Sequence, residues 1–242
     1  MKLNSPNINV MVKACRKAAK TLIRDFGEIE NLQVSIKGPG DFVTVSDKKV
    51  EKIIIDELEK ARPNYSILSE EAGEINKGKE FRWILDPIDG TANFLHGIPH
   101  FAISIGLEQN DEIICGIIYD PIKDEMFVAE KGNGSYLNNQ RIRVSKRSKL
   151  INCIIFTGGP KRDAENRSLV LEEYKKFSSN VLIPIRKFGS AALDMAYVAA
   201  GRIDGFWQRN LNYWDIAAGI VLIKEAGGYV TDFEGGKEYI KN

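Results

Sequence analysis

The sequence predicts an α+β fold in which helices and strands are stacked in layers. Three observations favour this class. The chain opens with helical periodicity, its middle carries strands joined by short turns, and its second half mixes strands and helices without a regular βαβ repeat. With 242 residues, 43% of them hydrophobic, the chain can bury a substantial core. We expect a single domain over residues 1–242.

Two amphipathic helices are predicted in the first quarter of the chain. The first covers about 8–27, where apolar residues recur every three to four positions. The second is expected to have Ser46 as its N-cap and to stop near Pro63, because proline cannot continue a helix.

From Phe81 onward the hydrophobic pattern becomes that of strands joined by short turns, which is typical of an antiparallel meander. A short apolar strand over 65–68 comes before it. The meander strands are expected at 81–85, 101–107, 113–119 and 125–129. The second half is expected to hold strands near 151–156, 181–187 and 204–207, and helices near 163–178, 190–200 and 214–226.

The composition narrows the range of functions. The formal net charge is +1, so no global field attracts nucleic acid or an acidic membrane. Cys15, Cys115 and Cys153 are far apart and lack the spacing of a zinc site, so we interpret them as core residues in a reducing compartment. No segment has the length and apolarity of a signal peptide or membrane span. We expect a soluble cytoplasmic protein without a membrane partner.

The most informative segment is Asp-Pro-Ile-Asp-Gly-Thr at 86–91, which follows a buried strand. Asp86 and Asp89 can supply the carboxylate oxygens that Mg²⁺ prefers, beside waters and phosphate oxygens. A kink at Pro87 would leave the carbonyl of Ile88 free as a further oxygen ligand. The next residues are expected to begin a helix whose free N–H groups can hold a phosphate. The alternative is that both acids are turn or cap residues.

Three other segments place acids at the ends of predicted elements. Glu70 and Glu71 directly follow the short strand that precedes the meander. Asp47 lies at the start of the second helix, and Asp215 at the start of the last long helix. Each acid alone is also typical of a helix cap or a solvent-exposed side chain. Their combination with the 86–91 segment favours one shared site.

Taken together, these segments resemble the inositol monophosphatase family. The resemblance covers essentially the whole chain. It rests on Gly-Asp-Phe-Val-Thr-Val-Ser-Asp at 40–47, Glu-Glu at 70–71, the 86–91 motif, Gly-Ser-Ala-Ala at 189–192, Trp-Asp at 214–215 and Glu-Ala-Gly-Gly at 225–228. It implies a layered αβαβα sandwich with a metal-binding half over about 1–145 and a substrate-side half over about 146–242. It also implies Mg²⁺ as cofactor, sensitivity to Li⁺ and a homodimer.

The family pattern assigns the metal ligands residue by residue. Glu70, Asp86 and the Ile88 carbonyl would hold one Mg²⁺. Asp86 would bridge to a second ion that Asp89 and Asp215 complete, so about two to three ions are expected per site.

The pattern also assigns the attacking water to Asp47 and Thr91, beside Glu70. Hydrolysis of a phosphate monoester needs a nucleophilic water and neutralisation of the charge on the phosphate and the departing alkoxide. Two metals about 3.5–4 Å apart can meet both needs. Proton transfer through Thr91 to Asp47 would add about 10²–10⁴-fold. We therefore predict direct in-line attack without a phosphoenzyme.

Substrate recognition is expected from the second half of the chain together with the metal loop. One residue departs from the family pattern: Gln208 stands where the family usually has Glu. An amide both donates and accepts hydrogen bonds without charge, so inositol as the substrate alcohol is in doubt. The predicted substrate-binding residues are Ile88, Asp89, Gly90, Thr91, Arg186, Gly189, Ser190, Ala191, Gln208 and Asp215.

The alternatives lie in three classes. An aspartyl-phosphate phosphatase has a similar motif, but one residue separates its two acids, whereas Pro87 and Ile88 both intervene here. A phosphatase of the same fold could act on a bisphosphate nucleotide, fructose bisphosphate or histidinol phosphate. A regulatory protein on the same scaffold could bind a transcription complex or RNA. For that role the basic cluster Arg141, Arg143, Lys146, Arg147 and Lys149 is a candidate surface, although such a cluster is also typical of a solvated face.

Overall fold

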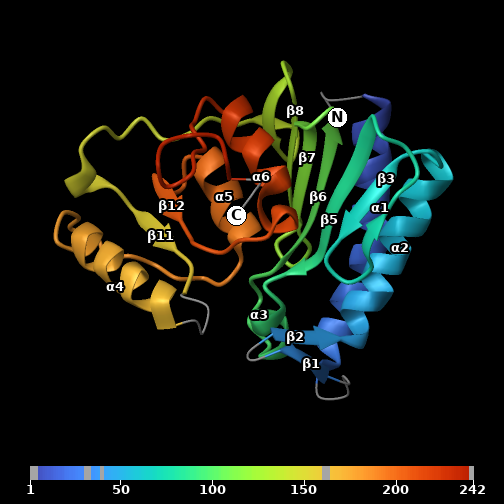
Figure 1. Cartoon of the computed structure of the whole chain (residues 1–242), viewed down its shortest axis with the longest axis horizontal. Coiled ribbons are helices and arrows are strands. Elements are labelled where there is room, and N and C mark those ends of the chain that lie inside the picture. The colour runs from blue at the N-terminus through green and yellow to red at the C-terminus, as the bar shows by residue number, and fades with distance from the viewer. Residues whose placement is uncertain (1–4, 30–33, 39–40, 160–163, 240–242) are drawn as a thin grey trace.

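The computed structural model describes residues 5–29, 34–38, 41–159 and 164–239, and they form five layers (Figure 1). A large sheet lies between two helical layers, and a small sheet and one further helix lie beyond the second of these layers. This order confirms the predicted αβαβα sandwich. The helices are α1 (Pro6–Gly27) and α2 (Val45–Ala61) on one face of the large sheet, α5 (Ala191–Ala199) and α6 (Tyr213–Glu225) on the other, and α4 (Ala164–Ser178) outermost.

The large sheet confirms the predicted antiparallel meander. All neighbouring strands in it run antiparallel except β3 and β5, which are parallel. Its order is β10 (Gln140–Arg141), β9 (Gly134–Leu137), β8 (Glu125–Glu130), β7 (Glu112–Asp120), β6 (Ala102–Gln109), β5 (Phe81–Asp89), β3 (Ser66–Ser69) and β4 (Gly73–Ile75). The smaller elements are β1 (Val34–Gly38) paired with β2 (Asp41–Thr44), α3 (Thr91–Leu95), the 3₁₀ helix η2 (Leu150–Asn152), and β11 (Ile155–Thr157) paired with β12 (Gly205–Trp207).

The predicted N-cap of the second helix is wrong. The N-cap of α2 is Thr44, whose hydroxyl accepts from the Asp47 N–H. Ser46 lies inside the first turn, and its hydroxyl donates to Asp25 at 2.7 Å. The Gly40 that opens the 40–47 motif lies outside the described residues.

The strand predicted over 181–187 is reduced to one parallel bridge between Phe156 and Arg186. Pro184 has no N–H to donate, so a continuous ladder cannot pass through this segment. The neighbouring strand, predicted over 151–156, begins only at Ile155 because η2 takes up the preceding residues.

The faces of the large sheet follow the period of two expected for strands. Trp83 and Leu85 of β5 are buried against α1 and α2, whereas Ile84 is buried against α5 and α6. The alternation places the next residue, Asp86, on the α6 side of the sheet. The position of Asp86 therefore follows from the same pattern that builds the core.

A pair of glycines lets α6 lie close to the sheet. Gly106 and Gly116 face each other across β6 and β7, and both lie under the small residues of α6. A Cβ on Gly106 would be 3.0 Å from Ala217 Cβ, and one on Gly116 would be 2.7 Å from the Ala218 carbonyl oxygen. The close contact fixes the height of α6, and hence of Asp215, above the sheet.

We predict that Gly116→Ala lowers the free energy of unfolding by about 1–3 kcal/mol, because overpacking against helix backbone forces α6 to shift. Urea unfolding measures the change. Gly27→Ala is the control, since nothing lies within 4 Å of a Cβ there. Equal stabilities for the two variants would contradict the close packing of α6.

The three cysteines are free and buried, as expected for core residues. Burial raises the pKa of the Cys115 thiol to about 12, so this thiol stays protonated at neutral pH. None of the helices in the described ranges combines the length and the apolarity needed to span a bilayer.

Candidate active site

The metal-site candidates Asp86 and Asp89 lie at the end of β5. Asp86 pairs with Ser104 of β6 and Asp89 with Ala102, so three steps along β5 match two along β6. The irregularity falls at Pro87, which cannot donate to a ladder. The Ile88 N–H instead donates to Asp86 Oδ1 at 3.0 Å, and the Ile88 carbonyl accepts from the Thr91 hydroxyl at 2.9 Å. The predicted irregularity at Pro87 is present, but the Ile88 carbonyl, which was predicted to be free, accepts from the Thr91 hydroxyl, and its role as a metal ligand stays a prediction.

Four acids from distant parts of the chain meet around Asp86. Asp86 is 2% exposed. Its pKa is raised well above the ordinary value, first by burial and then by the charges of Glu70, Asp89 and Asp215. The carboxyl groups of Glu70 and Asp86 are also in hydrogen-bond contact. The structure therefore brings together four of the acids that sequence reasoning placed in one site.

Asp89 connects the metal loop to α5. Its Oδ2 accepts from the Ser190 hydroxyl and from the Ala192 N–H at 2.8 Å. Ser190 is also the N-cap of α5 and accepts from the Leu193 N–H. Burial raises the pKa of Asp89 to about 6, although these hydrogen bonds act in the opposite direction. The predicted residues Ser190 and Ala191 thus border the carboxyl cluster.

Two glycines shape the loop that follows Asp89. Gly90 has φ +98° and Gly189 has φ +84°, a region that L side chains rarely adopt. A Cβ on Gly90 would be 3.3 Å from the Gly189 carbonyl oxygen, so the two backbones touch. Asn93 fixes this contact, because its Nδ2 donates to the His100 carbonyl at 2.8 Å and to the Phe188 carbonyl at 2.6 Å.

The remaining two acids of the cluster come from a hairpin loop and a helix start. Glu70 lies in the three-residue loop between β3 and β4, and its N–H donates to the Leu85 carbonyl at 3.3 Å. Asp215 lies in the first turn of α6, where its Oδ2 accepts from the Asn212 N–H at 2.7 Å. A strand end, a hairpin and a helix start therefore supply the carboxyl groups.

The substrate-side candidates lie around the small sheet. Arg186 pairs with β11 through its backbone, and its exposed guanidinium donates to the Pro184 carbonyl at 3.2 Å. Gln208 directly follows β12, and its side chain occupies the space beside Gly158 that a Cβ there would fill. Gly189 lies three residues after Arg186, so the segment that carries Arg186 leads directly into the loop that contacts Gly90.

Comparison with known proteins places this arrangement in a family. The model of the inositol monophosphatase family matches residues 3–242. The chain belongs to the inositol monophosphatase family. A Mesorhizobium japonicum protein named inositol-1-monophosphatase is 51% identical over 97% of this chain and 88% of its own length. An Escherichia coli protein named Nus factor SuhB is 40% identical over 97% of this chain and 88% of its own.

Solved structures of the family have the same fold. The extragenic suppressor protein suhB from Bartonella henselae superposes with a TM-score of 0.93 at 53% identity, covering 97% of this chain and 90% of that chain. An inositol monophosphatase from Thermotoga maritima gives 0.86 at 37% identity, covering 96% and 88%.

Asp47 and Thr91, which were predicted to handle the attacking water, are not joined by a direct hydrogen bond in the described residues. Asp47 Oδ2 accepts from the N–H and hydroxyl of Thr44, while the Thr91 hydroxyl donates to Ile88. Burial raises the pKa of Asp47 to about 6, and the charge of Glu71 acts in the same direction. The relay between the two residues stays a prediction.

Three residues of the site were not assigned a role from the sequence. Glu51 is buried behind the loop that carries Glu70, and Asn93 joins the metal loop to the substrate side. Asp194 is 1% exposed and its Oδ1 has no hydrogen-bond partner in the described part of the chain. Burial and the charge of Asp89 raise the pKa of Asp194 to about 8. In the sequence all three look like ordinary polar helix residues; burial distinguishes Glu51 and Asp194, and its hydrogen bonds to two distant carbonyls distinguish Asn93.

The chemistry of the cluster suits a divalent cation. Asp86 and Asp89 are both buried, and no lysine or arginine in the described residues forms an ion pair with either of them. Within the described ranges, no three His, Cys, Asp or Glu side chains already surround a point as metal ligands. Mg²⁺ commonly takes only one or two carboxylates and fills its shell with water and phosphate oxygens. Carboxyl groups that do not form a closed cage are therefore compatible with Mg²⁺.

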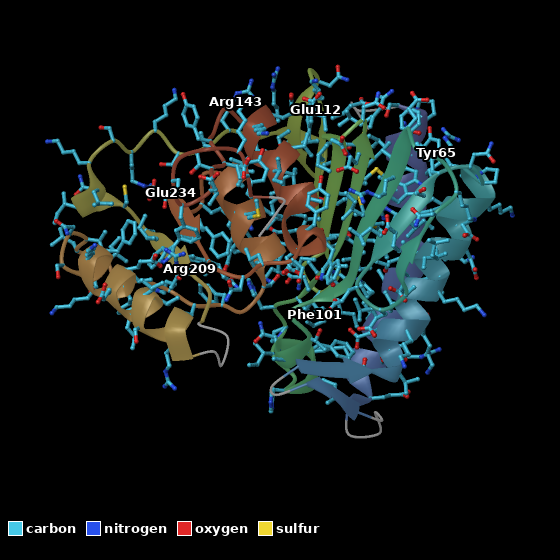
Figure 2. All side chains as sticks on the ribbon, in the orientation of Figure 1. Tyr65, Phe101, Glu112, Arg143, Arg209 and Glu234 are labelled. Atoms are coloured by element: carbon cyan, nitrogen blue, oxygen red, sulfur yellow. The ribbon has the colours of Figure 1, made fainter. Side chains whose placement is uncertain are left out.

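An open cavity of about 490 Å³ lies elsewhere, at the opposite end of the sheet. It is lined by Gln109, Glu112, Cys115 and Glu130 among others, and Gln109 pairs with Phe81 at the start of β5. Figure 2 shows Glu112 and Phe101 at opposite ends of the long strands, with Phe101 on the side of α3. None of the acids of the cluster lines this cavity, so it is not the candidate active site.

Proposed function

We propose that this chain is a Mg²⁺-dependent phosphatase that hydrolyses a small phosphate monoester, with inositol 1-phosphate or a related sugar or polyol phosphate as substrate. The single observation that carries the proposal is the cluster in which the carboxyl groups of Glu70, Asp89 and Asp215 act on the buried Asp86, in a chain of the inositol monophosphatase family. The relatives named inositol-1-monophosphatase support the same activity.

Different residues of the cluster would bind different metal ions. Glu70, Asp86 and the Ile88 carbonyl would hold one Mg²⁺, and Asp89 and Asp215 would complete a second site with Asp86. Mg²⁺ bound there would lower the pKa of the attacking water and offset charge on the phosphate. The backbone of Gly90 and Thr91 would orient the phosphate beside the metal loop.

Asp47 is proposed as the general base, with Thr91 ordering the water. A pKa of about 6 suits this task at neutral pH, because the group is ionised yet still able to take up a proton. The departing alcohol would lie toward Arg186 and Gln208. A homodimer and a cytoplasmic location are expectations carried by the family resemblance.

A phosphomonoester panel tests the proposal directly. We expect hydrolysis of inositol 1-phosphate or glycerol 2-phosphate with Mg²⁺, loss of activity in EDTA, and recovery when Mg²⁺ is added back. Inhibition by Li⁺ is expected as well. Full activity in EDTA, or activity on none of the monoesters, would contradict the proposal.

Gln208 is proposed to contact the alcohol part of the substrate and so to affect which substrate is preferred. We predict that Gln208→Glu raises kcat/KM on inositol 1-phosphate relative to glycerol 2-phosphate, because a carboxylate accepts hydrogen bonds from several ring hydroxyls. The ratio of the two kcat/KM values is the measurement. An unchanged ratio would show that Gln208 does not contact the alcohol.

A second candidate function is favoured by the relatives named Nus factor SuhB, at about 40% identity over nearly the whole chain. It is a regulatory binding role on the same scaffold, in a transcription complex. Co-purification of RNA polymerase components with the chain, unchanged by Asp86→Asn, would support this role. Absence of any such component would leave catalysis as the function.

A further inference from the structure

The buried carboxyl group of Glu51 lies behind the loop that carries Glu70. Glu51 is on α2, one helical turn after Asp47, and is 5% exposed. Its Oε1 accepts three hydrogen bonds: from the Ser69 hydroxyl, from the Glu71 N–H at 3.0 Å and from the Ala72 N–H at 3.1 Å. The donors come from residues on both sides of Glu70.

These bonds fix a loop that would otherwise have unpaired backbone groups. The loop joins β3 to β4 through Glu70, Glu71 and Ala72, and Gly73 closes it with φ +70°. The Glu70 N–H is held by β5, while the next two N–H groups point to Glu51. Because both N–H groups donate to one oxygen of a buried carboxyl group on α2, Glu51 holds the loop in this position.

We infer that Glu51 is a positioning residue that holds Glu70 against Asp86 and so sets the affinity of the site for its metal ion. The inference rests on the proposed function, since it assumes that Glu70 is a metal ligand. Glu51 bonds to the residues on either side of Glu70 and is not itself one of the proposed metal ligands. Residues that hold ligands in this way typically change metal affinity by about 10- to 100-fold when they are removed.

The same helix offers a matched control. Glu57 is also buried on α2, at 8% exposed, but it pairs with Lys13 and Lys17 of α1, away from the carboxyl cluster. Removing Glu57 costs packing and ion pairs of α2 without touching the loop that carries Glu70. A general loosening of α2 would therefore affect both variants, whereas a positioning role affects Glu51 alone.

Mg²⁺ binding to the full-length protein, measured by titration calorimetry, tests the inference without relying on turnover. We expect Glu51→Ala to weaken Mg²⁺ binding by about 10- to 100-fold and Glu57→Ala to leave it unchanged. Glu51→Gln retains Oε1 as an acceptor and is expected to recover most of the affinity. In activity assays Glu51→Ala should raise the Mg²⁺ concentration needed for half-maximal rate, while KM for the phosphate ester stays constant.

Wild-type affinity in Glu51→Ala, or equal weakening in Glu57→Ala, would overturn the inference. If Glu51→Ala does not fold, Ser69→Ala is the substitute variant, because it removes one of the three hydrogen bonds to Glu51. We expect Ser69→Ala to weaken Mg²⁺ binding several-fold, and unchanged binding would overturn the inference. Failure of the wild-type protein itself to bind Mg²⁺ would contradict the proposed function instead, so the two failures are distinguishable.

Discussion

Asp89→Asn and Asp215→Asn are each expected to lower turnover by about three orders of magnitude or more while the protein stays folded. Asparagine is nearly the same size and keeps an oxygen that can accept from Ala192 or Asn212. It removes the negative charge that would hold the metal ion. The loss therefore reports on charge at the site and not on packing. Steady-state kinetics at saturating Mg²⁺ measure it, with circular dichroism to check the fold.

The matched control is Asp111→Asn. Asp111 is an exposed residue in the turn between β6 and β7, with φ +62°, a conformation that asparagine tolerates. We expect wild-type turnover in this variant. Near-wild-type rates in Asp89→Asn or Asp215→Asn would refute the metal assignment.

The second large effect is on the stability of the metal-free protein as pH rises. Burial raises the pKa of Asp89 to about 6 in the folded state, above the ordinary value of about 3.9 for an unfolded chain. The folded state therefore binds the proton more tightly. This contribution to stability is fully present below pH of about 4 and is lost as pH rises through about 6. The raised pKa of Asp86 acts in the same direction.

Urea unfolding in EDTA between pH 4 and 7 is expected to show this loss as the difference between wild type and Asp89→Asn. The difference in the free energy of unfolding is expected to fall by about 1.4 kcal/mol per pH unit between the unfolded and the folded pKa of Asp89. Burial lowers the pKa of His100 to about 4, which makes stability rise with pH. Because both proteins contain His100, this effect cancels in the difference between them. Mg²⁺ should reverse the loss, by about 2.7 kcal/mol when its concentration is 100 times Kd. A difference that does not change with pH, or no stabilisation by Mg²⁺, would contradict the account.

The sequence predicted the architecture because its signals are local. The 3.6-residue period of α1 and the continuous apolar run of β5 are both visible without tertiary information. Which face of the sheet carries Asp86 was not predicted and is known only from the structure, in which Trp83 and Leu85 pack on one side and Ile84 on the other. The αβαβα order itself came from the resemblance, which the whole-chain family match bears out.

The errors arose where one contact outside the segment decides the structure. Thr44 and Ser46 are both good N-cap residues, and the choice is settled by Asp47 reaching back to Thr44 and by Ser46 bonding to Asp25. The 181–187 segment is rich in β-branched residues, yet Pro184 and its position at the sheet edge reduce it to a bridge.

The site was predictable in part for the same reason. Its four acids stand at element ends that a sequence pattern can locate, and the structure brings them together. Glu51 and Asn93 could not be assigned a role in this way. Their function is to hold a loop in place, and that depends on which backbone groups the fold leaves without partners.

The most direct test is a crystal of the wild-type protein soaked in Mn²⁺, an ion that shares the oxygen ligands of Mg²⁺ and scatters anomalously. We expect an anomalous peak among the carboxyl groups of Glu70, Asp86, Asp89 and Asp215, next to the Ile88 carbonyl. Saturating Mn²⁺ with no peak among these four carboxylates would contradict it.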